Sequence, residues 1–149
     1  MTQPGQHVAQ QFKHEGIVIK TMGDALLAMF NFPMKRDDHV RQSVMAARDL
    51  QANWARRRET LNEDCRDVGI GVGLDCGEVS FGEFGRAHQD LTAIGTVVNR
   101  AARAQAEAGP GEILVTEAVR ERCRLDLATA GAKEFALKGF DAPTRLWAA

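Results

Sequence analysis

The chain has 149 residues, a length that suits one domain with a single hydrophobic core, and we expect one domain over residues 1–149. Its 19 basic residues balance 20 acidic ones, so composition does not suggest a nucleic-acid or membrane-surface partner. No apolar run approaches the roughly 20 residues of a membrane span, and no signal peptide is recognisable. The three cysteines are scattered, which predicts free thiols and a cytoplasmic location.

The first predicted sheet element is a β-hairpin. Two apolar runs, Ile17–Ile19 and Ala25–Phe30, flank a short polar connection that contains Gly23. Apolar runs of strand length around such a connection predict a hairpin. Its tip carries a cation, Lys20, and a carboxylate, Asp24. Taken alone, these are ordinary residues of a surface turn, although a charge beside buried strands also suits a ligand or metal site.

Helices are predicted on both sides of this hairpin. Residues 7–14 have the pattern of a helix end, for which Gly16 would be the stop in the left-handed conformation. A long helix is predicted from about His39 to Glu59, with Asp37 or Asp38 as its N-cap. Its apolar residues recur at steps of three and four and form one buried stripe: Val40, Val44, Ala47, Leu50 and Trp54.

The middle of the chain predicts a second hairpin. Val68–Leu74 is a glycine-rich strand, and Glu78–Phe84 is its expected partner across a three-residue turn. Glycines at 69, 71 and 73 leave one strand face bare. We therefore expect another backbone or a ligand to approach that face closely.

The C-terminal half alternates helices and strands, which predicts an α+β fold with helices packed on a mostly antiparallel sheet. Thr96 is the expected N-cap of the next long helix, and Thr116 that of a short one. The expected elements are helices Val97–Ala108 and Thr116–Cys123 and strands Glu112–Val115, Lys133–Leu137 and Thr144–Trp147.

The segment Leu91–Arg103 reads LTAIGTVVNRAAR and resembles the signature of the class III nucleotidyl cyclases, the adenylate and guanylate cyclase family. Other family-like segments occur in the same order as in that family, and together they form a specific signal over about His7 to Trp147. They are Lys20–Asp24, Gly69–Val79, Gly109–Thr116 and Phe135–Phe140. The resemblance implies a ferredoxin-like nucleotide cyclase fold.

The resemblance also implies an activity, in which ATP is converted to 3′,5′-cyclic AMP and pyrophosphate with Mg²⁺ or Mn²⁺. Asp24 matches the second of the family's two metal-binding aspartates. Asn99 and Arg103 lie four residues apart on one helix face and match the residues that orient the ribose and stabilise the pentacovalent phosphate. Lys138 matches the lysine that holds the terminal phosphates.

Substrate choice and assembly follow from the same resemblance. Adenylate cyclases of this family read the adenine edge with a lysine and an aspartate or threonine, whereas guanylate cyclases typically use glutamate and cysteine. Lys20 and Thr92 match the adenine set, so we expect ATP as substrate. Family members bind substrate between two subunits packed head to tail, which implies a homodimer with two equivalent sites.

The sequence departs from the family pattern in one large way. The family's opening strand, which carries the first metal aspartate, has no counterpart in these 149 residues, and Arg100 stands where an apolar residue is usual. We therefore predict negligible cyclase activity for these residues alone. The chain is either a fragment of an active adenylate cyclase or a degenerate cyclase-homology domain that serves dimerisation or nucleotide sensing.

A ferredoxin-like RNA-binding or small-ligand module is a third possibility, because that fold supports many functions. It predicts solvent-facing aromatic residues on strands and a basic surface. Seven Phe, two Trp and a net charge of −1 weaken the RNA-binding version.

Overall fold

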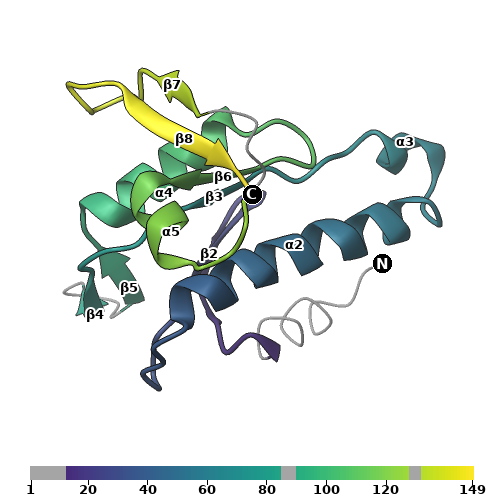
Figure 1. The fold of residues 1–149 in the computed structure, drawn as a ribbon. Helices are drawn as coiled ribbons and strands as arrows, with labels where there is room; N and C mark the ends of the chain where they lie inside the picture. The colour runs from purple at the N-terminus through teal and green to yellow at the C-terminus, as the bar shows by residue number, and fades with distance from the viewer. Residues whose placement is uncertain (1–12, 85–89, 128–131) are drawn as a thin grey trace.

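The computed structural model describes residues 13–84, 90–127 and 132–149 (Figure 1). Strands and helices alternate through these ranges, as the sequence predicts for an α+β protein. In chain order they are β1 (Ile17–Met22), β2 (Ala25–Met29), α2 (His39–Arg58), α3 (Glu63–Arg66), β3 (Val72–Leu74), β4 (Ser80–Phe84), β5 (Asp90–Ile94), α4 (Thr96–Glu107), β6 (Ile113–Thr116), α5 (Glu117–Arg122), β7 (Lys133–Phe135) and β8 (Thr144–Ala148).

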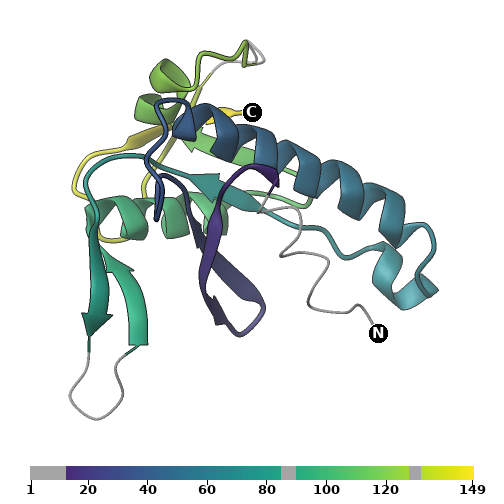
Figure 2. The ribbon, with the colours of Figure 1, turned by 90° about the horizontal axis from the view of Figure 1, so that it is seen from below.

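The described strands form a central sheet and two separate hairpins. The central sheet has the order β3-β6-β8-β7, while β1-β2 and β4-β5 are the hairpins. The β3–β6 pair is parallel, and the other pairs are antiparallel. Figure 2 shows both hairpins extending from the same side of the molecule. The prediction of a mostly antiparallel α+β fold is therefore confirmed.

Helices cover both faces of the central sheet. Side chains on successive residues of a strand point to opposite faces. Ile113 and Val115 of β6 pack with α2 and α5, while Leu114 packs with Ala104 of α4. Figure 2 accordingly shows α2 and α4 on opposite sides of the sheet. The stripe predicted for α2 is confirmed where it packs deepest, because Val40, Val44 and Ala47 are buried.

Glycines of the middle segment bring α4 against the sheet. A Cβ at Gly73 would lie 2.3 Å from the carbonyl oxygen of Ala101, and one at Gly71 would lie 2.8 Å from that of Ala108. Both distances are far shorter than a carbon–oxygen contact. The bare strand face predicted from the sequence is therefore filled by another backbone, that of α4 and the residue that follows it.

The predicted pairing of Val68–Leu74 with Glu78–Phe84 is wrong. The strand is limited to β3, which pairs with β6, and Ser80–Phe84 pairs with Asp90–Ile94 instead. The segment before β3 is held by other hydrogen bonds. The Ile70 carbonyl accepts one from Gly111 N, and the Val68 carbonyl accepts one from Trp54 Nε1. A sequence of alternating glycines does not distinguish these partners.

The first hairpin is confirmed, with two corrections. Its connection is Gly23-Asp24, and Gly23 has φ +62°, whereas Lys20 lies within β1 and not at the tip. The left-handed residue before β1 is Glu15, with φ +59°, and not Gly16. Gly16 is buried, and a Cβ there would lie 2.6 Å from the Phe30 ring. Close packing therefore explains that glycine. The helix predicted over residues 7–14 lies almost wholly outside the described residues.

The predicted N-cap side chains do not make capping hydrogen bonds. Asp38 and Thr116 occupy N-cap positions without a side-chain capping hydrogen bond, and Thr96 is the first residue of α4 after Gly95. The Asp38 carboxylate binds Arg36 and Gln42, and the Thr116 hydroxyl donates to Asp75. Each side chain therefore makes a tertiary or neighbouring contact that competes with capping.

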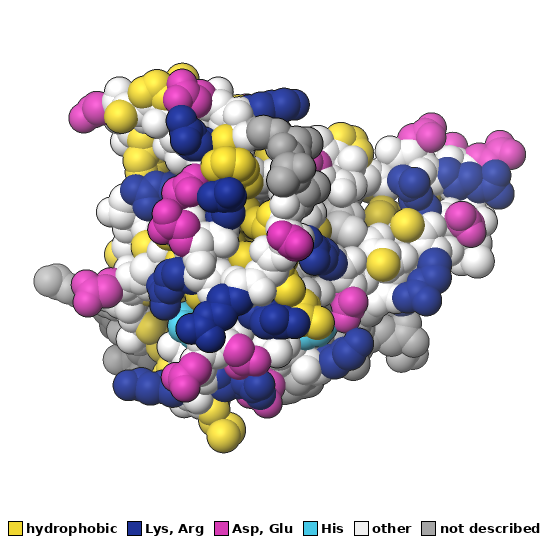
Figure 3. All heavy atoms as spheres, in the orientation of Figure 1, with side chains coloured by type: hydrophobic (Ala, Val, Ile, Leu, Met, Phe, Trp, Pro, Cys, Tyr) yellow, Lys and Arg dark blue, Asp and Glu magenta, His cyan; other side chains and the backbone are white. Residues whose placement is uncertain are grey.

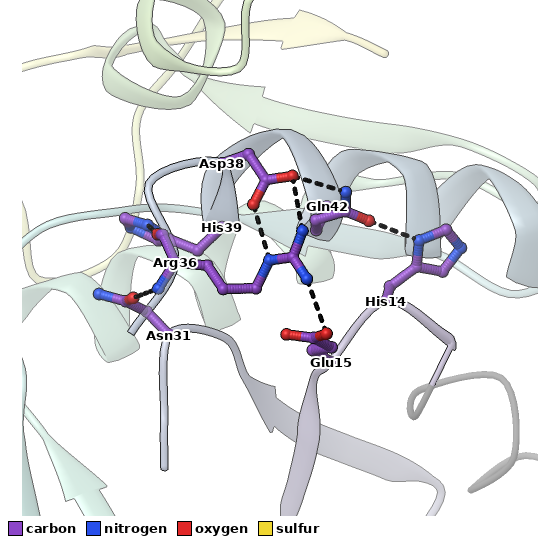
Figure 4. Close-up of polar contacts among 7 residues, drawn as sticks. All are labelled: His14, Glu15, Asn31, Arg36, Asp38, His39 and Gln42. Carbon is purple, nitrogen blue, oxygen red and sulfur yellow. Dashed lines mark hydrogen bonds and ion pairs between the residues drawn. The ribbon is translucent and has the colours of Figure 1, made fainter. Parts of the chain in front are cut away.

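A polar network joins the start of β1 to α2 (Figure 4). Arg36 contacts Asp38 through Nε at 2.8 Å and Glu15 through Nη1 at 2.6 Å. Gln42 Nε2 donates to Asp38 Oδ2, and Gln42 Oε1 lies 2.9 Å from His14 Nδ1. The hydrogen bonds from Arg36 and Gln42 hold the pKa of the Asp38 carboxyl far below its usual range.

Figure 3 shows basic and acidic side chains interspersed over one face of the molecule. The aromatic side chains described on strands, Phe81, Phe135 and Trp147, are all partly buried. Neither the face that Figure 3 shows nor these three side chains have the basic, solvent-facing aromatic character that the RNA-binding version predicts. No helix in the described ranges has the length and hydropathy that crossing a membrane requires.

Candidate active site

Helix α4 presents the predicted asparagine and arginine to solvent. Asn99 and Arg103 are both exposed, whereas Ala104 is 0% exposed and packs on the sheet. The helix is oriented by its apolar side, because its small residues meet the glycine face of β3. The small residues of α4 and the glycines of β3 therefore determine which side of the helix faces solvent. This orientation leaves the two polar side chains, which lie one turn apart, available to a ligand or a second subunit.

The predicted phosphate lysine lies in a tight turn near α4. The Phe140 amide donates to the Leu137 carbonyl at 3.1 Å, which closes the turn around Lys138 and Gly139. Gly139 has φ +88°, a left-handed conformation that favours glycine. Leu137 is 3% exposed and packs with Ala104, while Lys138 is exposed. The turn is thus anchored to the core on the α4 side of the sheet.

The predicted metal ligand lies at a different place. Asp24 is exposed in the turn between β1 and β2. In the part of the chain that the structure describes, no group of three or more His, Cys, Asp or Glu side chains is positioned to hold a metal ion. Magnesium prefers several oxygen ligands. Asp24 alone does not make such a site, so these residues by themselves do not fit a bound metal.

The two predicted base-reading residues lie on the two hairpins. Lys20 is exposed on β1, where it pairs with Leu27. Thr92 lies on β5, where its backbone pairs with Gly82, and its side chain is outside the described set. Strand β1 contacts β5, so the two hairpins that carry these residues are neighbours. The predicted site residues thus fall into two groups. The hairpin group is Lys20, Asp24 and Thr92, and the second group is Asn99 and Arg103 on α4 with Lys138 in its turn.

Arg100 links the parts of the second group. Its Nη1 donates to Asp75 Oδ2 at 3.1 Å, and its Cζ lies 5.0 Å from the centroid of the Phe140 ring. Phe140 ends the turn that holds Lys138. The sequence reasoning missed Asp75, although the departure at Arg100 signalled it, because a cation on the packed side of a helix needs a partner.

Asp75 is a buried carboxylate that accepts hydrogen bonds from three described donors. Its side chain is 1% exposed, and Oδ1 accepts hydrogen bonds from the Thr116 hydroxyl at 2.7 Å and the Cys76 amide at 2.9 Å. A buried charge is tolerated when it is paired and hydrogen-bonded in this way. Asp75 therefore binds the ends of β3 and β6 to the first half of α4.

The neighbouring thiol, Cys76, is partly buried. Burial raises the pKa of Cys76, and nearby Arg122 opposes that effect only in part. The thiolate is the reactive form of cysteine, and a raised pKa makes it scarce.

Comparison with known proteins identifies the family. The family model of the adenylate and guanylate cyclase catalytic domain matches residues 6–147. The chain therefore belongs to the adenylate and guanylate cyclase catalytic domain family, as its motifs predicted. This family is generally dependent on divalent metals.

Solved structures agree with the fold. The chain superimposes on the guanylyl cyclase Cya2 with a TM-score of 0.81 and 22% identity, covering 97% of this chain and 74% of that one. The adenylyl cyclase CyaB from P. aeruginosa gives a TM-score of 0.76 and 21% identity, covering 97% and 76%. The nucleotide cyclase fold is thereby confirmed. Since one neighbour is a guanylyl and the other an adenylyl cyclase, the fold does not select a base.

A curated relative, named putative adenylate cyclase 3 of Rhizobium meliloti (strain 1021), is 28% identical over 138 residues. The match covers 90% of this chain and 21% of the relative. The chain thus spans about a fifth of the length of that relative, and about a quarter of the first curated relatives that it matches.

Proposed function

We propose that this chain is an adenylate cyclase domain that binds ATP at a site shared by two copies packed head to tail. Its reaction is the attack of the ribose 3′-hydroxyl on the α-phosphorus, with formation of 3′,5′-cyclic AMP and departure of pyrophosphate. The observation that carries the proposal is the exposed Asn99–Arg103 pair on α4, set within the family motif. We further propose that the 149 residues alone are impaired or inactive.

The chemistry suits these side chains. Arg103 offers a planar fork of donors that matches phosphate oxygens and stays charged at any working pH. Asn99 offers both an acceptor and donors, which suits ribose hydroxyls. Lys138 contributes a point charge near the terminal phosphates. Together they would stabilise charge that develops on the transferring phosphoryl group.

Divalent metal enters the proposal through Asp24. In a head-to-tail pair, we propose that the hairpin turn of one copy supplies this carboxylate beside the α4 group of the other. Mg²⁺ or Mn²⁺ would polarise the phosphoryl oxygens there. Because the described residues bring no second carboxylate to Asp24, we assign no catalytic step to a metal on this chain.

Lys20 and Thr92 support ATP as the nucleotide. A lysine donates to a ring nitrogen, and a threonine hydroxyl accepts from the exocyclic amine, so the pair matches the adenine edge. The neighbouring positions of β1 and β5 are compatible with joint recognition. A site built to pair with the amine of one base discriminates strongly against another base.

The test is a titration of the 149-residue chain with inert analogues of ATP and GTP, each with and without Mn²⁺. We expect the ATP analogue to bind more tightly, and metal to strengthen its binding. K20E should reverse or abolish the preference, while K35E, a change at another exposed lysine, should leave it intact. Equal affinity for both analogues in the unmodified chain would refute the assignment of ATP. Clear production of cyclic AMP would refute the expected lack of activity.

A second candidate function is a degenerate cyclase-homology domain that serves dimerisation or nucleotide-dependent regulation. The single exposed carboxylate of the β1–β2 turn favours it, since two-metal chemistry needs more ligands. Sedimentation distinguishes the models. Dimers that tighten with ATP analogue and yield no product support the regulatory function, whereas a monomer at high concentration contradicts the shared site.

A further inference from the structure

Three parts of the molecule meet at the Arg100 guanidinium. Arg100 Nη1 donates to Oδ2 of Asp75, the residue after β3, at 3.1 Å, and Arg100 Cζ lies 5.0 Å from the centroid of the Phe140 ring. Asp75 is itself fixed to the sheet by the Thr116 hydroxyl and the Cys76 amide. Arg100 therefore connects the sheet, helix α4 and the turn that ends at Phe140.

The neighbours of Arg100 are the proposed nucleotide-binding residues. Asn99 precedes it on α4, and Arg103 follows one turn later. Lys138 lies in the turn closed by the Phe140–Leu137 hydrogen bond. Asn99, Arg103 and Lys138 are exposed, whereas the side chain of Arg100 is 32% exposed and directed toward Asp75. Arg100 thus acts on the packed side of α4 while its neighbours face outward.

We propose that Arg100 is a positioning residue of the nucleotide site, which fixes the Asn99 and Arg103 face of α4 relative to the turn carrying Lys138. This inference depends on the function proposed above. An apolar residue at position 100 would leave the buried Asp75 without its cation. A lysine would supply the charge without the flat guanidinium that lies over the Phe140 ring. Arg100 makes both contacts from one planar group.

The experiment compares R100L, R100K and the double variant D75N/R100L with the unmodified 149-residue chain. Each is tested for its melting temperature and for its affinity for an inert ATP analogue with Mn²⁺. We expect R100L to bind on the order of tenfold more weakly, because side chains that are no longer held in place must be ordered on binding. R100K should recover part of the affinity. D75N/R100L should recover melting temperature relative to R100L, because no buried charge is left unpaired, but should not recover affinity.

The double variant separates positioning from stability. If Arg100 only stabilises the fold, D75N/R100L should regain affinity together with melting temperature, and that result would overturn the inference. It also provides a folded protein if R100L does not fold. The matched control is R120L. Arg120 lies on α5 and pairs with a carboxylate, Glu117, and its Cζ lies 3.9 Å from the centroid of the Trp147 ring. R120L should keep the affinity.

The two proposals fail in different ways. If the unmodified chain does not bind the ATP analogue, the proposed function fails and this inference fails with it. If the unmodified chain binds but folded R100L and D75N/R100L bind equally well, the positioning role alone is overturned.

Discussion

His14 Nε2 lies 2.7 Å from Asp49 Oδ2, a contact that joins the entry of β1 to the middle of α2. The His14 side chain is 5% exposed, and its Nδ1 faces Gln42 Oε1. The amide nitrogen of Gln42 donates to Asp38, which fixes the amide oxygen toward the ring. Both ring nitrogens therefore face side-chain oxygens, which ties His14 to two positions of α2.

This contact predicts a loss of stability in acid. The hydrogen bond from His14 holds the pKa of Asp49 below its usual range, with a smaller contribution from Lys13. A carboxyl whose pKa is lower in the folded protein stabilises the fold above its unfolded pKa of about 3.9. That contribution is lost as pH falls through the folded pKa. We expect the free energy of unfolding in urea to fall from about pH 4 downward.

The D49N variant tests the source of that slope. It should lower the free energy of unfolding at pH 7 by about 0.2–1 kcal/mol, the range for partly exposed pairs, and flatten the decline in acid. D141N, a change at an exposed aspartate before β8, is the control and should leave the slope in place. An unchanged slope in D49N would show that other carboxyls account for it.

Gly73→Ala should destabilise the protein strongly. Its Cβ would lie 2.3 Å from the Ala101 carbonyl oxygen and from the Gln105 amide nitrogen, so α4 must move away from β3. Overpacking of this kind costs about 1–3 kcal/mol or more. G109A is the matched control, because a Cβ there meets Glu112 Oε2 at an ordinary 3.6 Å. Urea unfolding that gives both variants the same stability would contradict the close approach of α4.

Thr116→Val should cost more than Thr96→Val, although both threonines have the sequence pattern of N-caps. The Thr116 hydroxyl donates to the buried Asp75, so its removal costs about 1–3 kcal/mol of unfolding free energy. Thr96 is exposed and makes no side-chain capping bond, so T96V should lie within about 0.5 kcal/mol of the original. Equal losses in thermal unfolding would contradict a specific contribution from the Thr116–Asp75 hydrogen bond.

Local patterns predicted most elements and the exposed side of α4. The three- and four-residue spacing identified α2, and Gly23 identified the first turn, because both depend on neighbours in sequence. The family motif singled out Asn99 and Arg103, and their spacing of four residues places them on one helix face. Both are exposed on that face, and their role at a nucleotide site stays a prediction.

Long-range partners were not predictable in the same way. The pairing of β3 with β6, and the contacts of Asp75 with Arg100 and Thr116, join residues at least 25 positions apart. No local pattern records such a partner. The cap assignment of Thr116 failed for the same reason, because its hydroxyl binds a distant carboxylate and not its own helix.

The last prediction concerns the exposed pair on α4. N99A and R103A should each weaken binding of the inert ATP analogue, R103A by about tenfold or more, because a hydrogen bond to a charged group contributes about 1.5–3 kcal/mol. Both residues are exposed, so the melting temperature should change little. Q105A alters another exposed polar residue of the same helix and is the control. Affinity that falls in Q105A as much as in R103A would show a general effect of the helix surface. Affinity unchanged in R103A would remove the arginine from the nucleotide site.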